Sequence, residues 1–175
     1  MTGPEIFDHI NDSIKTCEDV INNMSSPPKI IHKSQDAYYN PSTDKINMPK
    51  MKSFTDSEGY YGVLFHELIH STGHTSHLNR DSIMKNEGYG SDIYSEEELI
   101  AQIGSCFIAS HTGTSMKHFE NDVAYIEGWF KQLKNDKRMF LFASAKAQRA
   151  VDYIPNYQFE DSQENIDDAQ MSKIK

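Results

Sequence analysis

Two histidines stand four residues apart in the segment YYGVLFHELIHSTGH, which runs from residue 60 to residue 74. Positions four apart lie on the same face of an α-helix, one turn above the other. His66 and His70 can therefore present imidazole nitrogens to one ion, which is how a His-x-x-x-His pair holds zinc. Apolar residues flank both histidines, so they belong to a largely buried helix, where polar groups need partners. The pattern predicts a zinc site.

Glu67 directly follows the first of these histidines. It lies one residue further round the predicted helix, where its carboxylate can reach a water molecule on the metal. Zinc lowers the pKa of such a water to about 7, and a carboxylate can then take its proton as the water attacks a carbonyl carbon. Glu67 is therefore the predicted catalytic base. A purely structural metal site has no use for a base at this position.

A third ligand is needed, because zinc sites for hydrolysis use three protein ligands and leave one position for water. His74 continues the row of histidines, but on a straight helix it would lie about 12 Å along the axis from the first one. A histidine ten residues after the first would also serve, but that position is Ser76. The remaining candidates are Glu97 and Glu98, in the segment SEEELIAQIGS.

Glu98 is favoured over Glu97, and either is favoured over His74. A second helix is expected to begin at Ser95. The side chains on the face that continues from Glu98 are small or polar, so this helix can lie close to the histidine helix. The face comprises Ala101, Gln102, Ser105 and Ala109. We expect Gln102 to hydrogen-bond a ligating histidine. Both glutamates also have interpretations that involve no metal. Glu98 can form a capping box with Ser95, and Glu97 can be a first-turn acid that interacts favourably with the helix dipole. The predicted metal ligands are His66, His70 and Glu98.

The elements before the histidine motif follow from hydrophobic periodicity. Apolar residues at helical spacing predict a helix over residues 4–24. The short β-prone segments KIIH, DAYYN and KINMP follow, and they predict a small antiparallel sheet. The histidine helix itself is expected to begin near residues 55–57 and to end at Gly73.

The elements after the motif are mostly helical. A long loop is predicted over residues 74–94, and helices follow from Ser95, over residues 120–133 and over residues 136–153. The fold class is therefore α+β, with helices predominating. Residues 1–154 are expected to form one domain, and the acidic tail of residues 155–175 to be disordered.

Composition limits the functions that this chain can have. The 175 residues carry a net charge of −9, which argues against a nucleic-acid surface, because phosphate binding needs clustered Lys and Arg. The sequence shows neither a signal peptide nor an apolar run near the roughly 20 residues that span a bilayer, so we expect a cytoplasmic protein without membrane contact. Cys17 and Cys106 are expected to be reduced, buried thiols.

Several separated motifs occur along the chain in a fixed order: YNPSTDKINMP from residue 39, YY and FHELIHSTGH from residue 60, LNR, EELIAQIG, and DKRMFLFASAKAQRAVDYI. Together they resemble the zincin-like metallopeptidase domain of ArdC-type antirestriction proteins. The resemblance covers about residues 13–154, and it is far more specific than the histidine pair alone.

The resemblance implies a zinc-dependent, peptidase-like domain in which His66 and His70 bind the metal, Glu67 is the base and a glutamate of the EEL segment completes the site. It also implies carriage on mobile genetic elements and a role in protecting incoming DNA. In that family the domain commonly follows a single-stranded-DNA-binding domain, which we do not expect in this sequence. The chain is then a stand-alone version, a fragment, or a protein that reaches DNA through a separate DNA-binding protein.

Two functions follow from these observations. The first is a zinc metallopeptidase that hydrolyses peptide bonds of a protein or peptide substrate, with an antirestriction-type role. The alternative is a non-catalytic, zinc-stabilised antirestriction or protein-binding module, in which the metal holds the fold together. The presence of Glu67 favours the first function.

Overall fold

A computed structural model describes residues 11–84, 92–114 and 137–154. This part of the chain is mostly helical with one small sheet, as the sequence predicts. In chain order the elements are α1 (Lys15–Asn22), β1 (Lys29–Ile31), β2 (Tyr38–Asn40), β3 (Lys45–Asn47), the 3-10 turn η1 (Met51–Ser53), α2 (Ser57–Ser71), α3 (Asp81–Met84), α4 (Asp92–Thr112) and α6 (Lys137–Asp152).

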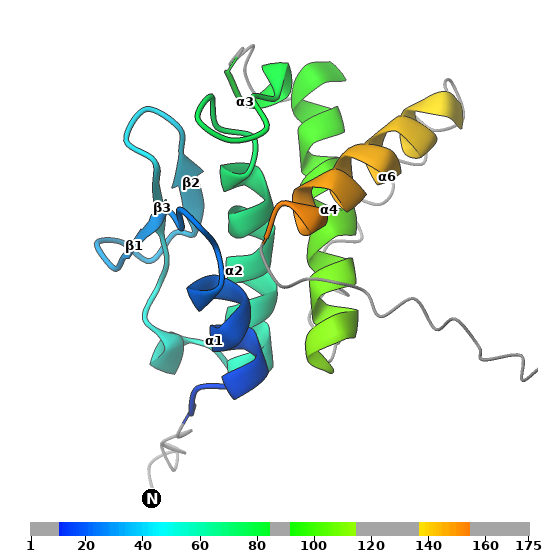
Figure 1. Ribbon diagram of the computed structural model, residues 1–175. Coiled ribbons are helices and arrows are strands. Elements are labelled where there is room, and N and C mark those ends of the chain that lie inside the picture. Colours follow the sequence, from blue (N-terminus) through cyan, green and yellow to red (C-terminus); the bar gives the residue numbers. More distant parts are fainter. Residues whose placement is uncertain (1–10, 85–91, 115–136, 155–175) are drawn as a thin grey trace, which may run out of the picture.

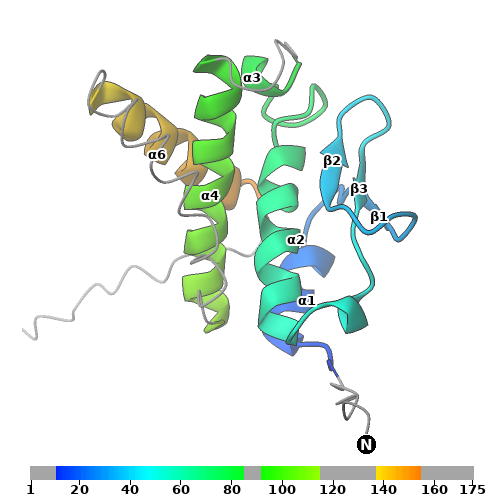
Figure 2. The ribbon, with the colours of Figure 1, turned by 180° about the vertical axis from the view of Figure 1, so that it is seen from behind.

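The histidine helix α2 is the middle layer of the molecule. The small sheet lies on one side of α2 and α4 lies on the other (Figure 1). Seen from behind, the order is α6, α4, α2 and the sheet (Figure 2). A helix between two layers must be apolar nearly all round. Five of its large apolar side chains are at most 1% exposed; these are Tyr61, Leu64, Phe65, Leu68 and Ile69.

The sheet has the order β1-β3-β2, so β3 is its central strand. The predicted antiparallel pairing is confirmed for β2 and β3, but β1 pairs with β3 in parallel, and the sheet is mixed. The loop between β1 and β2 folds around the buried side chain of Asn47. Asn47 accepts a hydrogen bond from Lys33 N–H at 2.9 Å and donates one to Ser34 Oγ at 2.8 Å. Because of this loop, β1 pairs with β3 and not with β2, the next strand in the sequence. β propensity alone does not reveal this arrangement.

The helix α2 begins where the sequence predicts and ends slightly earlier. Asp56 caps its first turn by accepting a hydrogen bond from Gly59 N–H at 2.8 Å. The last helical residue is Ser71, two residues before the predicted end at Gly73. A Cβ atom at Gly73 would lie 2.6 Å from Ile83 and 2.9 Å from Arg80. Glycine is therefore required here because Arg80 packs directly against the backbone.

The close packing of α4 against α2 agrees with the small face predicted for it. Ala101, Ser105 and Ala109 are all buried. Gly104 lies on the same helix and has no side chain. A Cβ atom at this position would lie 2.8 Å from two carbon atoms of the Ile69 side chain, so glycine allows α4 to approach α2 closely. The two helices can thus approach closely enough for side chains on one to reach side chains on the other.

Two predicted helix starts are wrong. Residues 11–14 are not helical, because the side chain of Asn11 donates to the carbonyls of Met51 and Phe54 and the Ile14 N–H donates to Tyr61 Oη. The helix α4 begins at Asp92, so Ser95 lies inside it and forms no N-cap. The predicted loop before α4 contains the short helix α3, and the last helix agrees with α6. Residues 4–10, 120–133 and 155–175 lie outside the described part, as do the predictions made for them.

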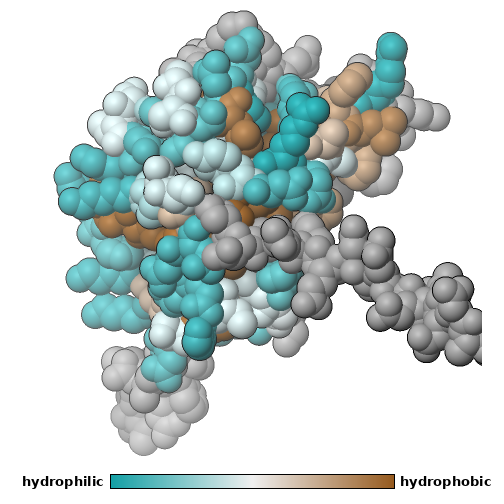
Figure 3. Space-filling view, viewed as in Figure 1, coloured by the Kyte–Doolittle hydropathy of each residue, from teal (hydrophilic) through white to brown (hydrophobic). Residues whose placement is uncertain are grey.

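The face shown in Figure 3 is mostly hydrophilic, with a hydrophobic patch near the outer end of α6. Phe140, Leu141 and Phe142 of α6 are between 46% and 68% exposed. Both cysteines carry free thiols: Cys17 is buried, which raises the pKa of its thiol to about 11, and Cys106 is half-buried. None of the helices in the described residues is long and apolar enough to cross a membrane.

Candidate metal centre

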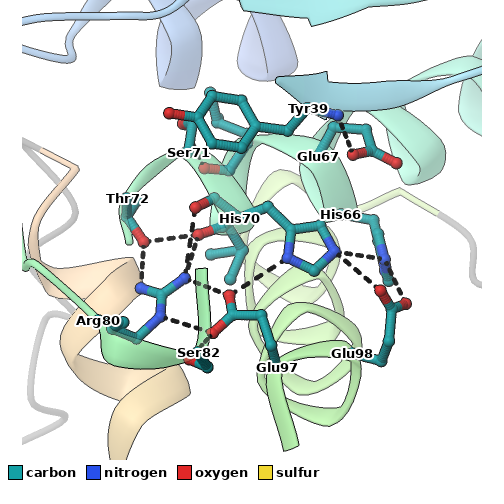
Figure 4. A network of polar contacts seen from close by, with 12 residues as sticks. Tyr39, His66, Glu67, His70, Ser71, Thr72, Arg80, Ser82, Glu97 and Glu98 are labelled. Atoms are coloured by element: carbon teal, nitrogen blue, oxygen red, sulfur yellow. Dashed lines mark hydrogen bonds and ion pairs between the residues drawn. The ribbon is translucent and has the colours of Figure 1, made fainter. Parts of the chain in front are cut away.

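Three predicted ligands converge in the space between α2 and α4 (Figure 4). The Nε2 atoms of His66 and His70 lie 3.1 Å apart, because the two residues occupy successive turns of α2. From α4, Glu98 places Oε2 at 3.3 Å from His66 Nε2 and Oε1 at 3.5 Å from His70 Nε2. The carboxylate therefore faces both imidazoles at once.

The spacing of these donor atoms fits a single metal ion. Zinc binds imidazole nitrogen and carboxylate oxygen at about 2.0–2.2 Å in a tetrahedral arrangement, which places any two ligand atoms about 3.3–3.6 Å apart. The two Nε2 atoms, 3.1 Å apart, agree with this requirement within a few tenths of an ångström, and each lies 3.3–3.5 Å from a different oxygen of Glu98. His66, His70 and Glu98 each offer one ligand atom within 4.8 Å of the other two, so this group can hold one divalent cation.

Glu97 lies behind His70, on the side away from the converging atoms. Its Oε1 is 3.2 Å from His70 Nδ1 and its side chain is 3% exposed. Burial alone would raise the pKa of Glu97, but hydrogen bonds from His70 and Arg80 lower it to about 2. An ionised Glu97 accepts the proton of His70 Nδ1, so the lone pair of that ring lies on Nε2, which faces His66 and Glu98.

Arg80 supports Glu97 from the segment that follows α2. Its Nη2 donates to Glu97 Oε1 at 2.6 Å and its Nε donates to Glu97 Oε2 at 3.0 Å, and Ser82 Oγ donates to the same carboxylate. The guanidinium also donates to Thr72 Oγ1 and to the carbonyl of Ile69, at 2.7 and 2.8 Å. Arg80 thus fixes the end of α2, the start of α4 and the orientation of His70 together.

Sequence reasoning missed this network. It assigned the support of a histidine to Gln102, whereas the group beside His70 is Glu97. A signal was present: two adjacent glutamates that face a buried helix require a buried cation, and Arg80 is the only arginine between α2 and α4.

Glu67 is positioned by the sheet. Its Oε2 accepts a hydrogen bond from the backbone N–H of Tyr39, in β2, at 2.8 Å (Figure 4). Only 9% of Glu67 is exposed.

Burial would lower the pKa of the neighbouring His70, but Glu97, Glu67 and Glu98 together raise it above the ordinary value. The pocket therefore favours positive charge, whether a proton or a metal ion supplies it.

His74, the other predicted alternative, does not join these residues. The chain leaves the helical path after Ser71, and His74 lies instead within 4.8 Å, measured between ligand atoms, of Asp44 and His77. The described residues thus contain two histidine clusters, which share no side chain.

Comparison with known proteins places the chain among metallopeptidase-like proteins. A family model described as zincin-like metallopeptidase matches residues 16–146. The uncharacterized protein y4eC of Sinorhizobium fredii is 35% identical over 136 residues, which cover 78% of this chain and 43% of y4eC. The DNA primase TraC of Escherichia coli is 35% identical over 141 residues, which cover 80% of this chain and 10% of TraC.

Two crystal structures of the antirestriction protein ArdC from plasmid R388 are also similar. The Mn(II)-bound structure has a TM-score of 0.69 and 34% identity, over 85% of this chain and 55% of the ArdC chain. The metal-free structure has a TM-score of 0.63 and 34% identity, over 84% and 50% of the two chains. The chain thus spans about half of ArdC and less than half of these curated relatives. A zincin-like family and a Mn(II)-bound relative together indicate a divalent metal.

Proposed function

This chain belongs to the zincin-like metallopeptidase family, and from that premise we propose that it is a zinc-dependent peptidase. His66, His70 and Glu98 hold the zinc ion, and Glu67 is the catalytic base. The observation that carries the proposal is the convergence of His66, His70 and Glu98, whose ligand atoms all lie within 4.8 Å of one another, with the carboxylate of Glu67 as a fourth, non-ligating group on the same helix as the histidines. A site that only stabilises the fold does not need that fourth group.

Zinc is proposed because two imidazoles and one carboxylate form a donor set that suits it and that leaves a position open for water or substrate. When bound there, zinc supplies a Lewis acid that polarises a carbonyl group and makes water more acidic. The ArdC structure holds Mn(II), so the test below compares both metals. In this proposal Glu97 holds His70 in the tautomer that can bind a metal. Arg80 in turn orients Glu97 by two hydrogen bonds.

Glu67 carries the proton transfers. Its carboxylate takes a proton from the attacking water, whose oxygen bonds to the carbonyl carbon of the peptide. The C–N bond then breaks, and Glu67 delivers the proton to the leaving amine nitrogen. The N–H of Tyr39 holds Oε2 of this carboxylate at 2.8 Å, so the side chain is oriented before substrate arrives.

The biological setting is proposed from the relatives. ArdC is named an antirestriction protein of a plasmid and TraC a DNA primase. We propose that this chain has an antirestriction-type role on a mobile genetic element, that it acts on a protein or peptide in the cytoplasm, and that a separate DNA-binding protein brings it to DNA. Its net charge of −9 supports an indirect route to DNA.

The test is the substitution Glu67→Gln in chelator-treated protein reloaded with Zn²⁺ or Mn²⁺. Glu58→Gln is the matched control, because Glu58 lies in the first turn of the same helix. We expect Glu67→Gln to keep its metal, measured by mass spectrometry, and to cleave casein or itself about 10²–10⁴-fold more slowly than wild type. The control should cleave normally. Equal cleavage by the Glu67 variant, or none by wild type, would favour the alternative of a non-catalytic zinc-stabilised module.

A further inference from the structure

A second histidine cluster lies outside the candidate metal centre. Asp44, in the turn between β2 and β3, and His74 and His77, in the segment after α2, each offer one ligand atom within 4.8 Å of the other two. All three residues are half-buried. The cluster joins parts of the chain that are about thirty residues apart in sequence.

His77 provides the strongest sign that something binds there. Its Nε2 is buried and has no hydrogen-bond partner within the described residues, which is rare for a buried polar atom. Its Nδ1 lies 2.6 Å from Tyr153 Oη, so this nitrogen can donate its proton to the phenol and leave the lone pair on Nε2.

The other two groups are held in place by their own partners. Tyr39 Oη donates a hydrogen bond to Asp44 Oδ1 at 3.0 Å. His74 Nδ1 lies 2.7 Å from Ser76 Oγ and accepts a hydrogen bond from the Ser76 N–H at 3.2 Å. Ligation through His74 Nε2 requires the other tautomer, in which Nδ1 donates to Ser76 Oγ and the bond from the Ser76 N–H is given up.

We propose that Asp44, His74 and His77 bind a second divalent transition-metal ion of the zinc type, which fastens the β2–β3 turn to the segment after α2. Two imidazoles and a carboxylate are ligands that zinc prefers. The ion also fills the unpaired position at His77 Nε2. Each ligand has a supporting hydrogen bond, as metal-binding side chains usually do.

The site has a structural connection to the proposed base. Tyr39 touches both: its hydroxyl donates to Asp44 and its backbone N–H donates to Glu67. An ion at Asp44 would therefore hold the residue that orients Glu67. The second site needs no peptidase activity, so it does not depend on the proposed function.

The experiment is a zinc titration by calorimetry of the chelator-treated full chain. Wild type should bind two equivalents, and the variant His66→Ala/His70→Ala should bind one. Adding Asp44→Asn and His74→Gln to that variant should remove the remaining equivalent. His111→Gln, which alters an exposed histidine at the end of α4, is the matched control and should change nothing. Cobalt gives an independent readout, since its visible absorption reports each bound ion.

The outcomes separate the two proposals. Loss of all binding in His66→Ala/His70→Ala, or one equivalent in wild type that His74→Gln leaves intact, would overturn the second site. One equivalent that survives His66→Ala/His70→Ala and is lost with His74→Gln would support the second site and refute the first. If His66→Ala/His70→Ala does not fold, His74→Gln alone decides, with an expected fall from two equivalents to one.

Tyr39→Phe sharpens the test without removing a ligand. It deletes the hydroxyl that holds Asp44 and leaves the backbone N–H that holds Glu67. We expect zinc affinity at the second site to fall about 10–100-fold, the usual effect of losing such a supporting group, with no change at the first. Unchanged affinity at the second site would mean that Asp44 is not a ligand.

Discussion

The two histidine clusters are built in different ways. In the first, His66 and His70 come from successive turns of α2, and Glu98 comes from α4, which packs along it. In the second, His74 and His77 come from the irregular segment after α2, and Asp44 comes from a hairpin turn in which its φ is 47°. The first cluster is thus placed by regular helices and the second by turns.

The groups behind the ligands differ as well. The first cluster is backed by Glu97 and Arg80, a buried pair of full charges. The second is backed by neutral hydroxyl groups of Tyr39, Ser76 and Tyr153. Since buried charges tolerate the loss of a partner poorly, the first cluster should be coupled to the stability of the whole fold, and the second should respond locally.

The largest expected effect is that of Arg80→Met, which tests this coupling. The side chains of Arg80 and Glu97 are 7% and 3% exposed, so removing the guanidinium leaves a buried carboxylate with only His70 and Ser82 as partners. We expect the free energy of unfolding, measured in urea, to fall by about 3–5 kcal/mol. Lys146→Met is the matched control: it breaks a more exposed pair with Glu96, of similar length, and should cost about 1 kcal/mol or less. Equal effects would show that Arg80 does not support the fold in the way described.

Next in size are the effects on zinc affinity at the first cluster, measured in a His74→Gln background so that only one site titrates. Glu97→Gln should weaken binding about 10–100-fold, because it removes only the support of His70. Glu98→Ala should weaken it more, because it removes a donor atom. If Glu97→Gln has the larger effect, Glu97 is the third ligand and the assignment of Glu98 is wrong.

The contrast between the clusters also explains which part of the site the sequence could predict. The interval of four residues between His66 and His70 is a property of the helix itself, so it is visible without a structure. The meeting of Asp44 with His74 depends on where a hairpin lies against a helix end, and no local pattern encodes that. The role of Glu97 was missed for the same reason, since it is set by Arg80, a residue in another segment.

The fold divides in a similar way. Hydrophobic periodicity predicted α2, α4 and α6, because their buried faces repeat with the helical period. It failed at the start of α1, where the side chain of Asn11 bonds to the carbonyls of Met51 and Phe54. It failed again at the start of α4, where Ser95 resembles a cap but lies within the helix. The first turn of a helix can depend on a single contact with a residue far away in the sequence, as at Asn11, and local periodicity does not report such a contact.

Gly104→Ala tests whether the first cluster depends on close helix packing. The added methyl group would lie 2.8 Å from the Ile69 side chain, so α4 must move away or Ile69 must shift. We expect a loss of about 1–3 kcal/mol in unfolding free energy and weaker zinc binding at the first cluster only. Combining it with Ile69→Val should cost less than the sum of the two single changes. Strict additivity would mean that the two residues are not in contact.

The smallest expected effect is that of Asp56→Ala, at the end of α2 opposite to both clusters. It removes the acceptor for the Gly59 N–H, and the free energy of unfolding should fall by about 1 kcal/mol. Asp56→Asn keeps an oxygen in the same place and should be nearly neutral. Neither change should alter zinc stoichiometry, because the first turn of α2 contributes no ligand. If Asp56→Asn destabilises as much as Asp56→Ala, the carboxylate acts through its charge, and the start of α2 is electrostatically coupled to its surroundings rather than simply capped.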